Sequence, residues 1–163
     1  RIDNGCPIPE KTSRFNDVKK EIDSYRSDSD TKVFLHVARY DPQKNQTLLI
    51  DAFNILNKEN MNFTLLCIGR DFDSNEGVKL QKKASYNIHF LGAKDNVGDY
   101  LHNADAFCLS STFEGLPISL IEAMACGVTP ICTPVGGIVD IITNEETGYL
   151  FKDTDLDSYV NAN

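Results

Sequence analysis

Residues 33–69 read VFLHVARYDPQKNQTLLIDAFNILNKENMNFTLLCIG and hold two short apolar runs on either side of a helical pattern. The first run, residues 33–39, and the second, residues 61–69, are apolar almost throughout, as strands buried on both faces of a sheet are. A strand, a helix and a second strand in this order are typical of a parallel sheet whose faces are covered by helices.

The helix between these strands is predicted over residues 44–58. Asp41 is expected as its N-cap and Pro42 as its first helical position. The apolar residues that recur at helical spacing are Leu48, Leu49, Ala52, Phe53 and Leu56.

The alternation continues toward the end of the chain. Further strands are predicted at residues 87–92, 104–110, 129–133 and 149–151. Helices are predicted at residues 76–85, 96–102, 117–126 and 137–143, with another beginning near residue 154. The predicted fold class is therefore α/β, a Rossmann-like parallel sheet with helices on both faces.

Length and charge limit the domain organisation and the partners. The 163 residues suffice for one domain, and residues 1–30 are interpreted as an exposed connector with one short helix, ahead of a domain over residues 31–163. Because residue 1 is Arg and the last helix is cut, the chain is expected to be a fragment truncated at its C-terminus. A net charge of −8 without basic clusters speaks against nucleic acid or an anionic membrane as the main partner. No apolar run is long enough to span a bilayer.

Several kinds of chemistry lack their motifs. The five cysteines are scattered without a C-x-x-C pair, so we expect reduced core residues of a cytosolic protein. Asp-x-Asp pairs lie in polar loops, and no metal site is expected. The glycine-rich loops of dinucleotide-binding and P-loop proteins are absent, and His36 and His89 are interpreted as core or sheet-surface residues.

Two cations follow the first predicted strand. Arg39 closes that strand, and Lys44 is placed in the first turn of the next helix. Ligands of open parallel sheets bind at the carboxyl ends of the strands, and helix N-termini favour anions. The two cations are therefore either a phosphate clamp or two solvated surface charges, and their spacing alone does not decide.

Two carboxylates lie in STFEGLPISLIEAMACG, residues 111–127, after the fourth predicted strand. This helix is apolar nearly all round, so we expect it to be mostly buried, with Glu122 on a narrow polar seam facing the crevice. A buried carboxylate needs donors, which are either structural groups or ligand hydroxyls. Glu114 is either an acid favoured by the helix dipole or a second ligand group, and the amides of residues 115–118 can receive a phosphate.

Together these features resemble the C-terminal, donor-binding half of the retaining glycosyltransferase family 4, whose members have the GT-B fold. FEGLPISLIEAMACGVTPICTPVGG, residues 113–137, resembles the family's motif of two Glu separated by seven residues. HVARYDPQKNQTLLIDAF, residues 36–53, resembles its Arg and Lys segment. LLCIG, NIHFLG, NADAFCLSS and TGYLF resemble further family segments in the same order, so the resemblance covers residues 33–151.

The resemblance implies a role for each candidate residue. Arg39 and Lys44 would hold the donor diphosphate and neutralise the leaving group, and Glu114 would bind hydroxyls of the donor sugar; these three are the catalytic candidates. Glu122 would accept hydrogen bonds from the ribose, and the loop after residue 90 would meet the nucleobase through its backbone. The other donor-binding residues implied are Gly69, Gly92, Ala93, Gly115, Leu116, Pro117 and Ile118.

The implied reaction is transfer of a sugar, with retention, from a nucleotide sugar to a glycan, lipid-linked or small-molecule acceptor in polysaccharide or glycoconjugate biosynthesis. No metal or cofactor is implied, and UDP or GDP is favoured over ADP as the donor nucleotide. The acceptor, and any contact with the inner face of a membrane, would come through an N-terminal half that precedes NGCPIP. We therefore expect a cytoplasmic enzyme, of which this chain alone binds donor weakly and transfers nothing.

Two other functions are kept open. A non-catalytic module that binds nucleotide sugars would use the same residues. A flavodoxin-like or receiver-type signalling domain would need an acidic cluster after the first strand, where Arg39 stands.

Overall fold

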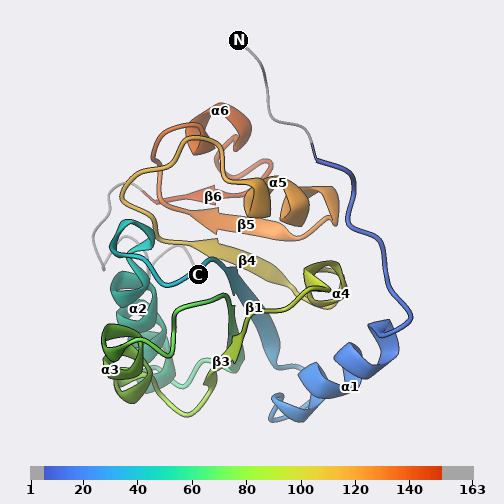
Figure 1. The fold of residues 1–163 in the computed structure, drawn as a ribbon, viewed down its shortest axis with the longest axis vertical. Helices are drawn as coiled ribbons and strands as arrows, with labels where there is room; N and C mark the ends of the chain where they lie inside the picture. Colours follow the sequence, from blue (N-terminus) through green and yellow to red (C-terminus); the bar gives the residue numbers. More distant parts are fainter. Residues whose placement is uncertain (1–5, 152–163) are drawn as a thin grey trace.

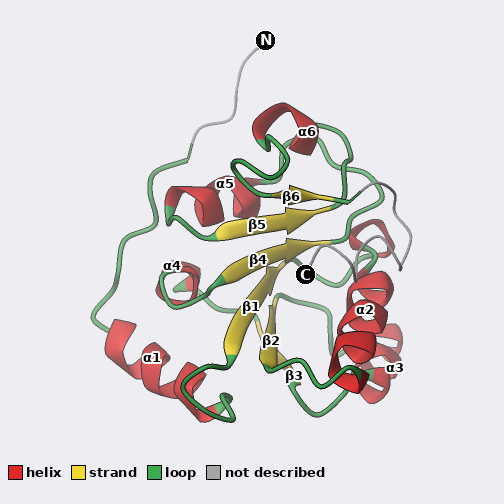
Figure 2. Cartoon of the chain, turned by 180° about the vertical axis from the view of Figure 1, so that it is seen from behind, coloured by secondary structure: helices red, strands yellow, loops and turns green. Residues whose placement is uncertain are grey.

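The computed structural model describes residues 6–151, in which a six-stranded sheet lies between two layers of helices (Figure 1). The order of the strands across the sheet is β3-β2-β1-β4-β5-β6, and every neighbouring pair is parallel (Figure 2). The strands are β1 (Lys32–Val37), β2 (Phe63–Ile68), β3 (Ile88–Gly92), β4 (Ala106–Leu109), β5 (Thr129–Cys132) and β6 (Tyr149–Leu150). The predicted Rossmann-like parallel sheet is confirmed.

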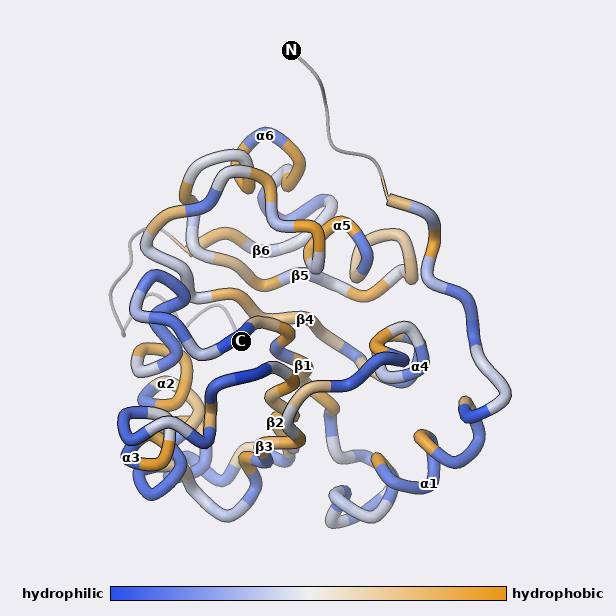
Figure 3. Tube along the Cα trace, viewed as in Figure 1, coloured by the Kyte–Doolittle hydropathy of each residue, from blue (hydrophilic) through white to orange (hydrophobic). Residues whose placement is uncertain are grey.

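Helices cover both faces of the sheet, as predicted. One layer holds α2 (Gln46–Lys58) and α3 (Asn75–Lys83). The other holds α1 (Phe15–Ser24), α4 (Val97–Leu101), α5 (Ile118–Ala125) and α6 (Ile138–Ile141). Figure 3 shows most residues of the strands as hydrophobic and most residues of α1 and α3 as hydrophilic.

Strands β1 to β5 each contribute to two separate cores because successive side chains point to opposite faces. In β1, Phe34 belongs to the cluster under α2 and α3, whereas Val33 and Leu35 belong to the cluster under α4 and α5. All six residues of β2 are buried. Burial on both sides explains why these strands are continuous apolar runs rather than alternating ones.

The helix after β1 begins later than predicted. Asp41 caps a short 3-10 turn, Pro42–Lys44, by accepting a hydrogen bond from the backbone N–H of Gln43 at 2.9 Å. Asn45 then adopts the left-handed conformation, with φ 48°, and α2 starts at Gln46. The prediction that Lys44 lies in the first turn of this helix was wrong, because the left-handed residue separates the two helical segments.

The segment before residue 31 is not simply an exposed connector. It contains the expected short helix, α1, but Val18 and Ile22 are only 4% and 1% exposed. Both belong to the same apolar cluster as Tyr100 and Leu101 of α4. The surface of α1 is polar elsewhere, which is why its composition resembled that of a connector.

The helix α5 is less buried than predicted. Only Leu120 and Ala123 are fully covered, and Ile118 is 55% exposed. The prediction of a mostly buried helix was therefore wrong, because α5 packs on the sheet along one stripe only. The last predicted helix, near residue 154, lies outside the described residues.

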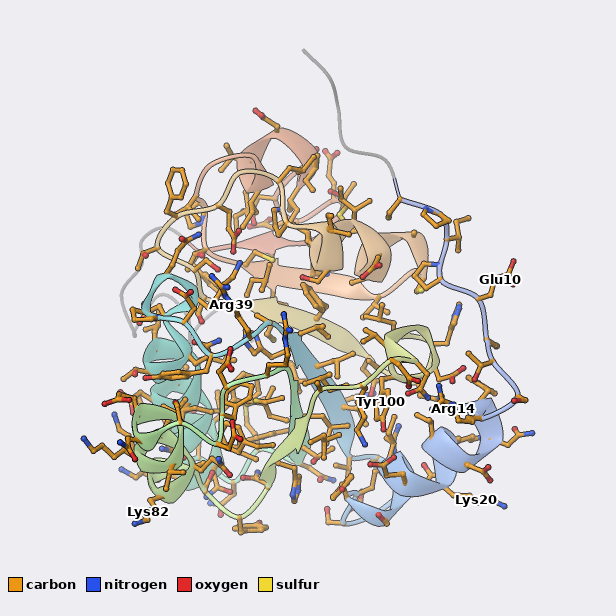
Figure 4. The ribbon with its side chains drawn as sticks, viewed as in Figure 1. Glu10, Arg14, Lys20, Arg39, Lys82 and Tyr100 are labelled. Carbon is orange, nitrogen blue, oxygen red and sulfur yellow. The ribbon has the colours of Figure 1, made fainter. Side chains whose placement is uncertain are left out.

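The packing of α1 can be tested by truncating its buried side chain. Ile22→Ala should lower the free energy of unfolding by about 2–4 kcal/mol, because it removes buried methyl groups and leaves a cavity. Lys20→Ala, on the exposed side of the same helix (Figure 4), should change it by less than about 0.5 kcal/mol. Urea denaturation measures both, and equal midpoints would mean that α1 does not pack on the domain.

Candidate functional site

A cavity of about 700 Å³ opens at the carboxyl ends of the strands. Loops that follow β1, β2 and β3 form its walls together with the start of α5. The cavity therefore lies where the chain crosses from one half of the sheet to the other, between β1 and β4, which is where ligands of such sheets bind. Its lining residues are Val37, Ala38, Arg39, Asp41, Gln43, Lys44, Ile68, Gly69, Arg70, Ala93, Lys94, Val97, Pro117, Ile118 and Ser119.

The charged side chains of this cavity are mainly cationic although the chain as a whole is acidic. Arg39, Lys44, Arg70 and Lys94 line it against the single carboxylate of Asp41. The N–H of Gln43 and, to a smaller extent, the Arg39 guanidinium hold the pKa of Asp41 below its usual range. An anionic ligand is therefore favoured over a cationic one.

A series of buried hydrogen bonds holds the loop that contains Arg39. Gln46 Nε2 donates to the carbonyl of Arg39 at 2.8 Å and to His36 Nε2 at 3.3 Å. Nδ1 of His36 in turn donates to the carbonyl of Cys108 at 2.9 Å. These bonds join the loop after β1 to α2 and to β4, so the position of Arg39 is set by rigid elements.

His36 is neutral at physiological pH in this setting. Its side chain is fully buried, and burial lowers its pKa to about 4. The interpretation of His36 as a core residue is confirmed. Its uncharged ring can accept the hydrogen bond from Gln46, which a protonated ring cannot.

Two residues that follow β4 hold the loop that contains Lys44. Ser110 Oγ lies within hydrogen-bond distance of two carbonyls, those of Lys44 at 2.9 Å and Asn45 at 3.0 Å. The backbone N–H of Thr112 donates to the carbonyl of Gln43 at 2.9 Å. The loops that follow β1 and β4 are thus tied together by their backbones.

Lys44 and Glu114 form an ion pair across these two loops. Lys44 Nζ lies 2.6 Å from Glu114 Oε1, and Ser111 Oγ donates to the same oxygen at 2.6 Å. The Glu114 side chain is only 6% exposed. Within residues 6–151, Oε2 of Glu114 accepts no hydrogen bond, so it is the oxygen left for a ligand hydroxyl.

The backbone around Glu114 lies directly against two glycines. A Cβ atom at Gly136, whose φ is +53°, would overlap the carbonyl oxygen of Glu114. The N–H of Gly137 donates to the carbonyl of Gly115 at 2.7 Å. The glycine pair after β5 therefore lets the loop before α5 approach closely enough to place Glu114 beside Lys44.

The first turn of α5 offers unpaired backbone donors to the cavity. Pro117 precedes the helix, and the N–H groups of Ile118 and Ser119 donate to no group in residues 6–151. Glu122 lies one turn further along and is half-buried, and burial raises the pKa of its carboxyl group. No donor among the described residues bonds Glu122, so its carboxylate is free to accept from a ligand.

The structure brings some of the predicted residues into the cavity and places others beside it. Arg39, Lys44, Gly69, Ala93, Pro117 and Ile118 line it. Gly92 lines a neighbouring cavity of about 520 Å³, and Glu114 reaches the site through Lys44. Gly115, Leu116 and Glu122 lie in the loop before α5 or in α5 itself but do not line the cavity.

Sequence reasoning missed the residues that hold these loops. They are His36, Gln46, Ser110 and Ser111. Two further cations of the cavity, Arg70 and Lys94, were missed as well. A signal was present for the serines, because they directly follow a strand, as ligand-site residues of parallel sheets do.

Within residues 6–151, neither a metal centre nor a membrane-spanning helix accompanies the site. Residues 6–151 contain no group of three or more His, Cys, Asp or Glu side chains that could hold a metal ion. Among the helices of the same residues, none combines the length and apolar character that a membrane crossing needs.

Comparison with known proteins gives a family match over most of the chain. Residues 17–162 match the family described as glycosyl transferases group 1. The chain is 27% identical, over 99% of its length, to a UDP-Gal:alpha-D-GlcNAc-diphosphoundecaprenol alpha-1,3-galactosyltransferase of Escherichia coli, of which it covers 43%. It is 32% identical, over 96% of its length, to the capsular polysaccharide biosynthesis glycosyltransferase CapH of Staphylococcus aureus, of which it covers 40%.

A solved structure has the same fold. The crystal structure of Anabaena Alr3699/HepE in complex with UDP-glucose matches 93% of the chain with a TM-score of 0.78 and 21% identity. The match covers 42% of that chain. The chain thus spans less than half the length of the relatives that it matches.

The contact between Gly136 and Glu114 predicts a large effect of one methyl group. Gly136→Ala should destabilise the protein by more than about 3 kcal/mol, because it adds an overlap with backbone to a left-handed conformation. Gly127→Ala is the matched control, since its φ is +75° but its surroundings are open. It should cost about 1 kcal/mol. Equal losses in chemical denaturation would contradict the close contact.

The burial of His36 predicts a pH-dependent stability. At pH 5 the unfolded chain binds a proton on this ring and the folded protein does not, so stability falls by about 2 kcal/mol between pH 7 and pH 5. His36→Gln should lose less stability over this range. Burial also lowers the pKa of His89, and this shift changes the stability of the unaltered protein and of His36→Gln equally. Parallel curves of unfolding free energy against pH would contradict a neutral, buried His36.

Proposed function

We propose, because the chain belongs to the glycosyl transferases group 1 family, that its cavity binds the nucleotide-sugar donor of a retaining glycosyltransferase. The observation that carries this proposal is the meeting of three cations, Arg39, Lys44 and Arg70, with the free N–H groups of α5 at one cavity. That combination suits a diphosphate, which needs charge neutralisation and several hydrogen-bond donors. Glu114 and Glu122 also have carboxylate oxygens that accept no hydrogen bond from the described residues. These oxygens suit the hydroxyls of a sugar and a ribose.

Arg39 is the residue best placed to exchange its partner for the diphosphate. Its side chain is 61% exposed and pairs with Asp41 at 2.8 Å. An exposed ion pair contributes at most about 1 kcal/mol, so a phosphate can replace Asp41 at little cost. The guanidinium would then neutralise the charge that develops on the leaving group.

Glu114 and Glu122 would hold the two sugars of the donor. Oε2 of Glu114 would accept a hydrogen bond from a hydroxyl of the transferred sugar, while Oε1 stays bonded to Lys44 and Ser111. Glu122 would accept from the ribose hydroxyls, which would supply the donors that its carboxylate lacks. The bond between the anomeric carbon and the phosphate oxygen breaks, the acceptor oxygen bonds the same carbon from the same face, and its proton passes to the leaving phosphate.

The names of the relatives support a UDP-linked donor as the substrate and a cell-surface polysaccharide as the product. The Escherichia coli relative is named for UDP-Gal, the HepE structure contains UDP-glucose, and CapH is named for capsular polysaccharide biosynthesis. The acceptor would bind mainly to a further half of the enzyme, through which any membrane contact would also occur. The chain alone would therefore bind donor without transferring sugar.

Donor binding can be tested by calorimetric titration of this chain with UDP-glucose, GDP-mannose and ADP-glucose. We expect binding of at least one, and Arg39→Ala should raise its Kd about tenfold or more, because a charge-assisted hydrogen bond is lost. Glu122→Ala should also weaken binding. Lys82→Ala, which removes an exposed cation of α3, should leave the Kd unchanged.

No heat from any of the three at millimolar concentration would contradict donor binding. Binding that survives both Arg39→Ala and Glu122→Ala unchanged would contradict the residue roles.

A further inference from the structure

Lys94 separates two cavities of the molecule. It lines the main cavity, and it also lines a second one of about 540 Å³ that lies beneath α1. The second cavity is formed by α1 and by the segment that runs from β3 into α4. Ala93 lines both cavities too, and Lys94 is the charged residue that they share, so a change beside Lys94 on the α1 side can reach the main cavity.

The ammonium group of Lys94 is held by α1 and α4. Lys94 Nζ lies 3.5 Å from Glu21 Oε1 and 5.5 Å from the centre of the Tyr100 ring. The hydroxyl of Tyr100 donates to the other Glu21 oxygen, Oε2, at 2.7 Å. Tyr100, which is labelled in Figure 4, is only 1% exposed, so Glu21 is anchored to a fixed point. A carboxylate and an aromatic face thus restrict where the lysine can point.

Further bonds fix the segment around Lys94 to the N-terminal part of the chain. Arg14 Nη2 lies 2.8 Å from Asp95 Oδ1. The backbone N–H and the hydroxyl of Thr12 donate to the carboxylate of Asp99 at 2.7 and 2.6 Å. Residues that lie outside the main cavity therefore fix the position of the wall that contains Lys94.

Strand order decides which part of a donor Lys94 would meet. Lys44 and Glu114 lie after β1 and β4, in the middle of the sheet, whereas Lys94 follows β3 at its edge. A donor whose diphosphate lies at the centre would extend its nucleoside toward β3 in this cavity. The side chains of Val37, Ile68 and Val97, which also line it, would supply the apolar surface that a flat base needs.

We infer that Lys94 donates a hydrogen bond to a ring carbonyl oxygen of the donor's nucleobase and that Glu21 positions it. This inference rests on the proposed function, because it needs a nucleotide in the cavity. Uracil and guanine carry ring carbonyl oxygens and adenine carries none, so the contact selects against adenine. An ammonium group is a donor only, which matches a carbonyl acceptor.

The test compares the affinities of UDP, ADP and inorganic pyrophosphate for this chain by calorimetry. Lys94→Met should raise the Kd of UDP about tenfold, because a hydrogen bond from a charged donor is lost. The Kd of ADP should rise less, and that of pyrophosphate should not change. Lys94→Arg, which keeps a charged donor, should restore part of the preference for UDP.

Glu21→Gln tests the positioning role. The amide oxygen can still accept from Tyr100, so thermal unfolding should be unchanged, but the charge that holds Lys94 is lost. The ratio of UDP to ADP affinity should fall, with pyrophosphate binding unchanged. Asp17→Asn is the matched control on α1, because Asp17 lines the second cavity without an ion pair to Lys94. Lys82→Met is the control for the loss of a cation.

The possible failures are distinguishable. If the unaltered chain binds no nucleotide, the proposed function fails and this inference with it. If the chain binds UDP and Lys94→Met binds it equally well, the proposed function stands and the base contact is refuted. Equal losses for UDP, ADP and pyrophosphate would instead mean that Lys94 acts on the phosphates, which also overturns the inference.

Discussion

The ion pair of Lys44 and Glu114 is the interaction on which the geometry of the site depends. It joins the loops after β1 and β4, the two strands between which the chain reverses its path across the sheet. Removing either partner would leave a largely buried charge, which costs about 3–5 kcal/mol in comparable cases. Two further contacts place Glu114 within reach of Lys44. Ser111 donates a hydrogen bond to the Glu114 carboxylate, and Gly136 lies directly against the Glu114 backbone. The start of α5 is fixed by the same contacts.

Because of this pair, the cations of the cavity differ in how readily they can bind a phosphate. Lys44 is committed to Glu114, with a side chain only 21% exposed, so its charge is partly neutralised before any ligand arrives. Arg39 has only an exposed bond to Asp41, and it is the cation that can turn to a phosphate at least cost. The N–H groups of Ile118 and Ser119 add donors without adding charge. A cavity of this kind attracts a diphosphate even though the chain carries a net charge of −8.

The sheet could be predicted from the sequence because its strands are buried on both faces and therefore appear as continuous apolar runs. The start of α2 could not, because Asn45 in a left-handed conformation interrupts a pattern that reads as one helix. Arg39, Lys44 and the loop of Glu114 were predicted to share a site from their positions after strands. The bonds that hold them were not predictable, since Lys44 and Glu114 are 70 positions apart and the polar partners His36 and Gln46 look like ordinary strand and helix residues.

The side chains that hold the loops belong to rigid elements or stand directly beside them. His36 lies in β1, Gln46 begins α2, and Ser110 follows β4 directly. A ligand would therefore lose little binding energy to the ordering of the protein. Weak binding of a donor by this chain alone would then have another cause, which is incomplete burial of the ligand. Arg39 is 61% exposed on the cavity wall, so a phosphate bound to it stays partly in water, where an ion pair is screened. A second wall over Arg39 would strengthen that contact without any change in the residues that make it.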